Sequence, residues 1–210
     1  TIAEFDGPEG MIAAIDRAGY FEVTTLSADD VKRNEMYKEN LKRAELEQSF
    51  GNYEDYLKSL DMRCETGAFV PEHAERLTQL INKTNQFNLT TRRYTAAEVD
   101  HLMQDPASVT VFGRLIDKFG DNGIVSAMIG HIEDDTCYVD LWIMSCRVFK
   151  RGLEDTMMDE FVRRSVEKGA KRIVGRYFAT AKNLLTREIY ATMGFSKMKD
   201  SETEAEFVLE

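Results

Sequence analysis

Cys146 is the residue whose surroundings point most directly to chemistry. It is followed by Arg147, Lys150 and Arg151 within the stretch CRVFKRG. Nearby cations favour the thiolate over the thiol, and the thiolate is the nucleophilic form. Cys146 is therefore a candidate nucleophile for covalent catalysis. The alternative is a small apolar residue that packs at the end of a strand.

The elements around this basic stretch predict an anion site. Residues 137–148 are rich in β-branched and aromatic side chains, which indicates a strand, and residues 153–166 repeat apolar side chains at helical spacing. The first N–H groups of a helix lack internal partners and bind phosphate well. The predicted phosphate ligands are the N–H groups of Gly152 and Leu153 with the side chains of Arg147, Lys150 and Arg151. The alternative is a solvated basic loop.

A polar stretch at residues 83–94 predicts a second binding element. It carries too many amide and hydroxyl groups for a core element, which is typical of a loop that binds a ligand. The alternative is a connector whose side chains satisfy one another. In both cases Phe87 and Leu89 should anchor the stretch to the core. The candidate binding residues are Asn85, Gln86, Asn88, Thr90 and Arg92.

Composition limits the classes of function. The chain has 210 residues, a net charge of −10 and a pI near 4.9, which argues against general nucleic-acid binding. No apolar run approaches the roughly 20 residues of a membrane span, and no signal peptide is visible. Three cysteines without CxxC spacing suggest neither a disulfide framework nor a metal site, so a reducing cytoplasm is expected.

The order of predicted elements indicates an α/β domain that begins near residue 62. Residues 1–61 read as a helical arm, with helices at 8–19, 27–50 and 52–60. Strands are predicted at 62–70, 109–118, 124–132, 137–148, 171–178 and 206–209, and helices at 71–82, 95–105, 153–168 and 182–193. Thr95 and Glu98 match a capping box. Asp140, a charge within a central strand, is expected to pair with Arg176 on the neighbouring strand, and Trp142 is expected in the core.

This order resembles the GNAT acyltransferase fold, a mixed sheet flanked by helices. Arg147-x-x-Lys150-x-Gly152 is similar to that family's pyrophosphate loop, although Lys150 replaces its first glycine. Asn183 and the stretch YATMGF (190–195) resemble the motif of its later helix. The resemblance implies coenzyme A binding and a role for Tyr190 as the acid that protonates a leaving thiolate. The alternatives are a Tyr190 that packs against the sheet and an Asn183 that caps its helix.

Four further stretches, KTNQFNLTTRRYT (83–95), DKFGDNGIVS (117–126), WIMSCRVFKRGLE (142–154) and ATAKN (179–183), resemble the C-terminal half of FkbH-like proteins, also called HAD-superfamily subfamily IIIC. In such proteins a HAD phosphatase-like domain precedes this half, and a glyceryl unit passes through an enzyme thioester to a carrier-protein thiol. The resemblance implies that Cys146 holds the thioester, with a phosphopantetheine arm or coenzyme A as cofactor and no metal here.

The implied partners are an acyl carrier protein and an N-terminal HAD-like domain, with neither nucleic acid nor membrane. Two other functions stay open at this point. One is acetyl transfer from acetyl-CoA to an amine. The other is a non-catalytic docking module, whose patch would comprise Arg92, Arg93, Arg147, Lys150 and Arg151.

Overall fold

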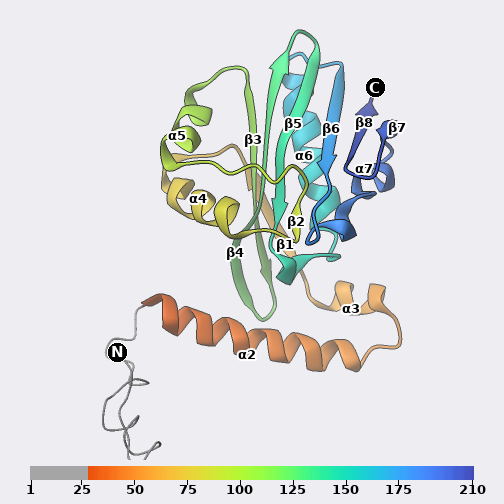
Figure 1. Cartoon of the computed structure of the whole chain (residues 1–210). Helices are drawn as coiled ribbons and strands as arrows, with labels where there is room; N and C mark the ends of the chain where they lie inside the picture. Colours follow the sequence, from red (N-terminus) through yellow and green to blue (C-terminus); the bar gives the residue numbers. More distant parts are fainter. Residues whose placement is uncertain (1–27) are drawn as a thin grey trace, which may run out of the picture. The chain divides into compact units, whose positions relative to one another are not determined.

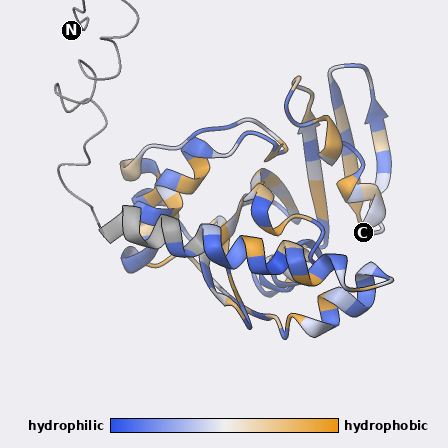
Figure 2. Cartoon of the chain, turned by 90° about the horizontal axis from the view of Figure 1, so that it is seen from below, coloured by the Kyte–Doolittle hydropathy of each residue, from blue (hydrophilic) through white to orange (hydrophobic). Residues whose placement is uncertain are grey.

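The computed structural model describes residues 28–210, so the predicted helix at 8–19 lies outside the described residues. The chain divides into two units between Gln48 and Ser49. In the first unit, the part of α2 (Ala28–Gln48) that Figure 2 colours is largely hydrophilic. None of the helices in residues 28–210 combines the length and the hydropathy of a transmembrane span.

The second unit is built on one mixed sheet in the order β1-β3-β4-β5-β6-β8-β7 (Figure 1). The β5–β6 pair is parallel and the other neighbours along this order are antiparallel. A two-residue strand, β2, pairs with β5 outside this order. The strands are β1 Arg63–Gly67, β2 Phe87–Asn88, β3 Ser108–Asp117, β4 Gly120–Glu133, β5 Thr136–Met144, β6 Arg172–Phe178, β7 Ser196–Asp200 and β8 Glu204–Leu209.

Helices cover the sheet on both faces. α4 (Ala74–Lys83), which follows a 3-10 turn at Pro71–His73, and α5 (Ala96–Gln104) close one core cluster over Ile129, Leu141 and Ile143. On the other face α6 (Leu153–Glu167) closes a cluster that includes Trp142 and Tyr177. The predicted capping box forms, because Thr95 and Glu98 bond reciprocally. This architecture confirms the predicted mixed sheet flanked by helices.

Several boundaries differ from the sequence prediction. β5 ends at Met144, and Cys146–Val148 forms a 3-10 turn instead of continuing the strand. The predicted helix at 182–193 is two short pieces, a 3-10 turn at Leu184–Thr186 and α7 (Ile189–Thr192). β7 was not predicted because all five of its residues are exposed and charged or polar residues dominate it. α3 (Tyr53–Ser59) belongs to the second unit.

Candidate functional site

The site is organised around the place where β5 and β6 separate. The two strands pair only between Thr136–Val139 and Arg172–Gly175. Beyond that point the segment 87–89 lies between them and bonds to both strands. The N–H of Leu89 donates to the carbonyl of Trp142 at 3.3 Å, and its carbonyl accepts from the N–H of Phe178 at 2.8 Å. The predicted binding loop therefore contributes a strand-like segment that fills the gap.

Asn183 locks this segment in place. Its Nδ2 donates to the carbonyls of Asn88 at 2.8 Å and Phe178 at 2.9 Å. Its Oδ1 accepts from the Tyr177 hydroxyl at 3.0 Å and from the N–H of Thr180 at 2.8 Å. The residue is completely buried. Since both atoms of the amide have their full complement of partners, Asn183 holds the segment and has no free group for a ligand.

The other polar residues of the loop divide into two groups. Asn88 and Thr90 are buried and bond to backbone: Asn88 Oδ1 accepts from the N–H of Thr91, and the Thr90 hydroxyl donates to the carbonyl of Asp140 at 2.6 Å. Asn85 and Gln86 are exposed. The buried pair matches the connector interpretation of this stretch. Of the exposed pair, Asn85 also bonds within the loop, since its Oδ1 accepts from the guanidinium of Arg93 at 2.6 Å.

The predicted nucleophile lies at the surface. Cys146 is exposed at the start of the 3-10 turn that follows β5, so it does not pack in the core. The Nε of Arg147 donates to the hydroxyl of Ser145 at 3.3 Å. The Lys150 side chain is exposed, and its ammonium group lies 5.8 Å from the ring centre of Phe149. This loop therefore carries an exposed thiol and two cationic side chains close together in the sequence.

The start of α6 already carries anions of its own. Lys150 has a positive φ of 64°, and its N–H donates to the buried carboxylate of Glu154 at 2.5 Å. Gly152, with φ 81° and ψ 4°, provides the left-handed turn into the helix. The first turn holds two acids, Glu154 and Asp155. A buried carboxylate thus already lies at the entrance to the helix where the sequence predicted a phosphate.

Arg151 turns inward. Its guanidinium lies 3.5 Å from the carboxylate of Asp117, whose side chain is fully buried. The same carboxylate accepts from the N–H of Phe119 at 3.0 Å. Because a buried carboxylate needs its cation, Arg151 is committed to the fold, which leaves Arg147 and Lys150 as the cations of the loop.

Tyr190 lies in the core. It is completely buried, its ring is 5.8 Å from that of Trp142 and 5.2 Å from that of Phe195, and its hydroxyl has no partner among the described residues. The ring sits directly over Gly175, where an added Cβ would lie 2.5 Å from it. Burial raises the pKa of this phenol far above its ordinary value. A hydroxyl this enclosed has no route to a substrate, and the position matches the packing alternative.

One cluster was missed. The predicted ion pair between Asp140 and Arg176 does not form. Arg176 pairs with Glu206 at 2.9 Å instead. The two oxygens of Asp140 contact Arg92 and His131. A charged residue in a central strand with a histidine on the preceding hairpin strand was the available signal, but strand register was needed to bring these two residues together.

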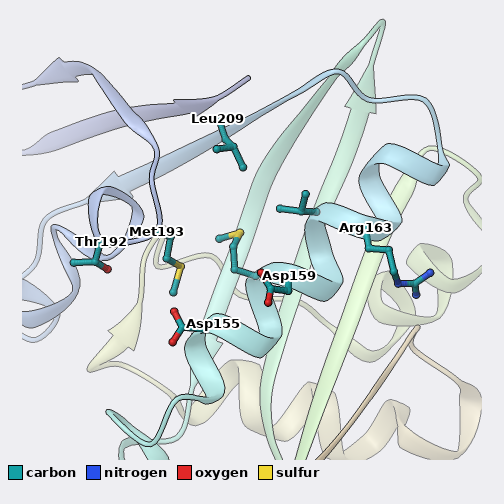
Figure 3. Close-up of a pocket in the computed structure, with 8 residues that line it drawn as sticks. Asp155, Asp159, Arg163, Thr192, Met193 and Leu209 are labelled. Carbon is teal, nitrogen blue, oxygen red and sulfur yellow. The ribbon is translucent and has the colours of Figure 1, made fainter.

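A groove of about 560 Å³ lies between α6, α7 and β8 (Figure 3). Its lining is apolar at Met158, Met193 and Leu209 and acidic at Asp155 and Asp159. Figure 3 shows the side chains of Asp155 and Met193 pointing toward one another across it. No predicted site residue lines the groove. Its one cation among the described residues, Arg163, is paired with Glu160 and Glu167, so the two aspartates would repel a phosphate. In residues 28–210 no group of His, Cys, Asp and Glu side chains could hold a metal ion.

Solved structures share this fold. The GNAT domain of S. lividans PAT matches with a TM-score of 0.55 at 11% identity, over 70% of this chain and 89% of that one. The ribosomal-protein-S18-alanine N-acetyltransferase from Escherichia coli matches at 0.53 and 9%, over 70% and 93%. Rv2747 from Mycobacterium tuberculosis, solved with CoA and NLQ, matches at 0.54 and 10%, over 69% and 98%.

The sequence itself matches no protein-family model and no curated protein. The structural likenesses confirm the GNAT-like fold predicted from the order of elements. At identities near one in ten, they establish the fold alone.

Proposed function

We propose that this chain is an acyltransferase. The fold supports acyl transfer in general, because its structural neighbours include acetyltransferases of several kinds. The more specific proposal follows the FkbH-like motifs: a glyceryl-type acyl unit passes through a thioester on Cys146 to the phosphopantetheine thiol of a carrier protein. The resemblance places a HAD-like domain before this half as its partner, and the free thiols suit a reducing cytoplasm.

The observation that carries this proposal is the exposure of Cys146 in a basic turn. Of the three cysteines, Cys64 is half-buried and Cys137 is buried, and burial raises the pKa of each to about 11. Cys146 is therefore the one thiol in the described chain that a bulky acyl donor could reach. Arg147 and Lys150 next to it would attract the phosphate of a pantetheine arm.

The proposed chemistry is two thioester exchanges. In the first, the Cys146 thiolate attacks the carbonyl carbon of the donor thioester; a new C–S bond forms, the old one breaks, and the donor thiolate leaves and takes a proton. In the second, the carrier thiolate attacks the Cys146 thioester and restores the free cysteine. No oxidant or metal enters either step.

The test uses the N-acetylcysteamine thioester of glyceric acid as donor and intact-mass analysis of the chain. The wild type should gain one glyceryl unit. Cys146→Ser should gain none, and Cys64→Ser should behave as the wild type. Absence of the adduct from the wild type, or its persistence in Cys146→Ser, would sink the covalent route.

Acetyl transfer from acetyl-CoA to an amine is a second candidate, favoured by the structural likeness to N-acetyltransferases. The segment 87–89 and the Glu154 carboxylate count against it, since they occupy the gap and part of the loop where an extended donor would bind. A rise in melting temperature with coenzyme A would support this candidate, because a ligand that binds only the folded state stabilises it. If the chain forms no glyceryl adduct and its melting temperature does not change with coenzyme A, the non-catalytic docking role is the remaining candidate.

A further inference from the structure

His131, Asp140 and Arg92 form a cluster on the sheet, away from the cysteine loop. His131 Nδ1 lies 2.6 Å from Asp140 Oδ2, and the guanidinium of Arg92 contacts the other oxygen of the same carboxylate. The His131 side chain is 42% exposed, whereas that of Asp140 is 18% exposed. The Nε2 of His131 has no partner in the described part of the chain. One ring nitrogen is thus held by a carboxylate, and the other is unbonded in a side chain that is partly exposed.

A β-bulge places the carboxylate. Gly130 pairs with Val139 and Ile129 pairs with Leu141, so Asp140 is the extra residue on β5. Val139 belongs to the core cluster beneath α6, whereas Leu141 belongs to the one beneath α4. A bulge changes which way the strand presents its side chains and frequently re-aims one for a function. Here the bulge lets the charged side chain of Asp140 point out of the core, although the strand around it is buried.

The loop that fills the gap between β5 and β6 contacts Asp140 at two points. The Thr90 hydroxyl donates to the carbonyl of Asp140, and the Arg92 guanidinium contacts its carboxylate. Between them Thr91 adopts φ 59°, which is unfavourable for a β-branched residue. Its N–H is held by the side chain of Asn88. Strained residues of this kind persist where the surrounding structure fixes them, and they concentrate at functional sites.

The histidine ring is also fixed from its own side. It stacks on Tyr138, with ring centres 5.3 Å apart and planes 18° from parallel. Tyr138 is contacted in turn by Arg176. The guanidinium of Arg176 lies 5.2 Å from the centre of the Tyr138 ring and pairs with Glu206. α4 and α5 lie over the β3–β4 side of the sheet, away from β6 and β8 (Figure 1). A substrate could therefore approach the ring from solvent.

We propose that His131 is a general base in this chain, with Asp140 and Arg92 as the residues that position it. The carboxylate holds the Nδ1–H tautomer, so the lone pair of Nε2 points outward and can take a proton from a nucleophile that attacks an acyl group. The acyl class of the substrate rests on the proposed function; the proton transfer does not. β5 runs four more residues from Asp140 to its end at Met144, about 13 Å at about 3.3 Å per residue, and Cys146 lies in the turn beyond that end, so the two sites act separately.

The test uses 4-nitrophenyl acetate, a general acyl donor, with Cys146→Ser as the parent protein so that the thiol cannot contribute. Water attacks the ester carbonyl, its proton passes to His131 Nε2, and 4-nitrophenolate leaves with acetate as the second product. The parent should hydrolyse the ester faster than free imidazole at equal concentration. Its rate should be lower in D₂O than in H₂O because a proton moves in the slow step.

His131→Gln should lower this rate by about 10²-fold, the low end of what a positioned base contributes. Asp140→Asn and Arg92→Gln should each lower it less and alter its pH profile, with Asp140→Asn the larger effect. The matched control is His101→Gln, an exposed histidine on α5, which should leave the rate unchanged. An equal rate in His131→Gln and its parent, or a rate insensitive to D₂O, would overturn the proposal. Failure of the glyceryl adduct on Cys146 would leave this result untouched.

Discussion

The side-chain amide of Asn183 donates to the backbone carbonyl of Asn88, 2.8 Å away and 95 positions earlier in the sequence. This contact joins the loop after β6 to the segment that fills the space between β5 and β6. The ends of the two parallel strands are thereby connected through the chain itself. A donor that lies extended along β5 has to compete with Phe87–Leu89 for the same backbone groups.

Removing this amide should destabilise the fold. Asn183→Ala would leave the carbonyls of Asn88 and Phe178 without that donor, and the Tyr177 hydroxyl without its 3.0 Å acceptor. We expect a loss of about 3 kcal/mol in the free energy of unfolding, because each unsatisfied buried group costs about 1–3 kcal/mol. Urea denaturation measures it. Gln86→Ala, at an exposed position of the same loop, is the control; equal midpoints for the two variants would contradict the locking role.

Arg151 and Lys150 should behave differently although they are adjacent cations. Arg151→Gln leaves the buried carboxylate of Asp117 without its cation, so the free energy of unfolding should drop by about 1–3 kcal/mol. Lys150→Gln, at an exposed side chain, should stay within about 0.5 kcal/mol. Thermal denaturation of both variants separates the roles. A destabilised Lys150→Gln beside an unaffected Arg151→Gln would reverse the assignment.

Thiol labelling should identify Cys146 as the reactive cysteine. At pH 8 the thiols of Cys137, which is buried, and Cys64, which is half-buried, are almost entirely protonated, because burial raises the pKa of each to about 11. Iodoacetamide should therefore modify Cys146 first in the native protein, and all three cysteines after unfolding in urea. Peptide mass mapping over time reads this out. Labelling of Cys137 at the rate of Cys146 would show that the strand end opens readily.

Stability should also fall in alkaline solution. The pKa of Cys137 rises from 9.0 to about 11 on folding, chiefly through burial. Unfolding then releases a proton between these values, so the contribution is complete below pH 9 and is lost as the pH rises toward 11. Cys137→Ala should reduce the slope of unfolding free energy against pH in this window. An unchanged slope would place the cause elsewhere, for example at Tyr94, whose pKa burial raises to about 12.

Periodicity predicted the elements whose apolar residues repeat regularly. The strand at 124–132 and the helix at 153–168 appear as β4 and α6, and the capping box at Thr95 forms with its predicted partners. β2 was not predicted, since two residues carry no period. β5 stops at Met144 because Ser145 and Cys146 leave the ladder for a 3-10 turn, which apolar content alone does not reveal.

The sequence could predict the features of the candidate site that depend on one short stretch, but not the contacts between residues far apart in the sequence. The exposure of the Cys146 stretch agrees with its basic composition. By contrast, Asn183 and Asn88 meet across 95 positions, and Asp140 contacts His131 instead of Arg176 because a bulge shifts the register of β4 and β5. Pairwise contacts of this kind depend on which strands are neighbours and on one extra residue, and neither is written in local composition.

The second half of the proposed reaction gives the most direct test of acyl transfer through Cys146. Protein carrying one glyceryl unit is separated from excess donor and mixed with pantetheine, and both the protein and the small thiol are followed by mass spectrometry. The account predicts that acyl-pantetheine appears at the rate at which the adduct leaves Cys146. An adduct that stays on the protein, or is lost only as free glyceric acid, would contradict it.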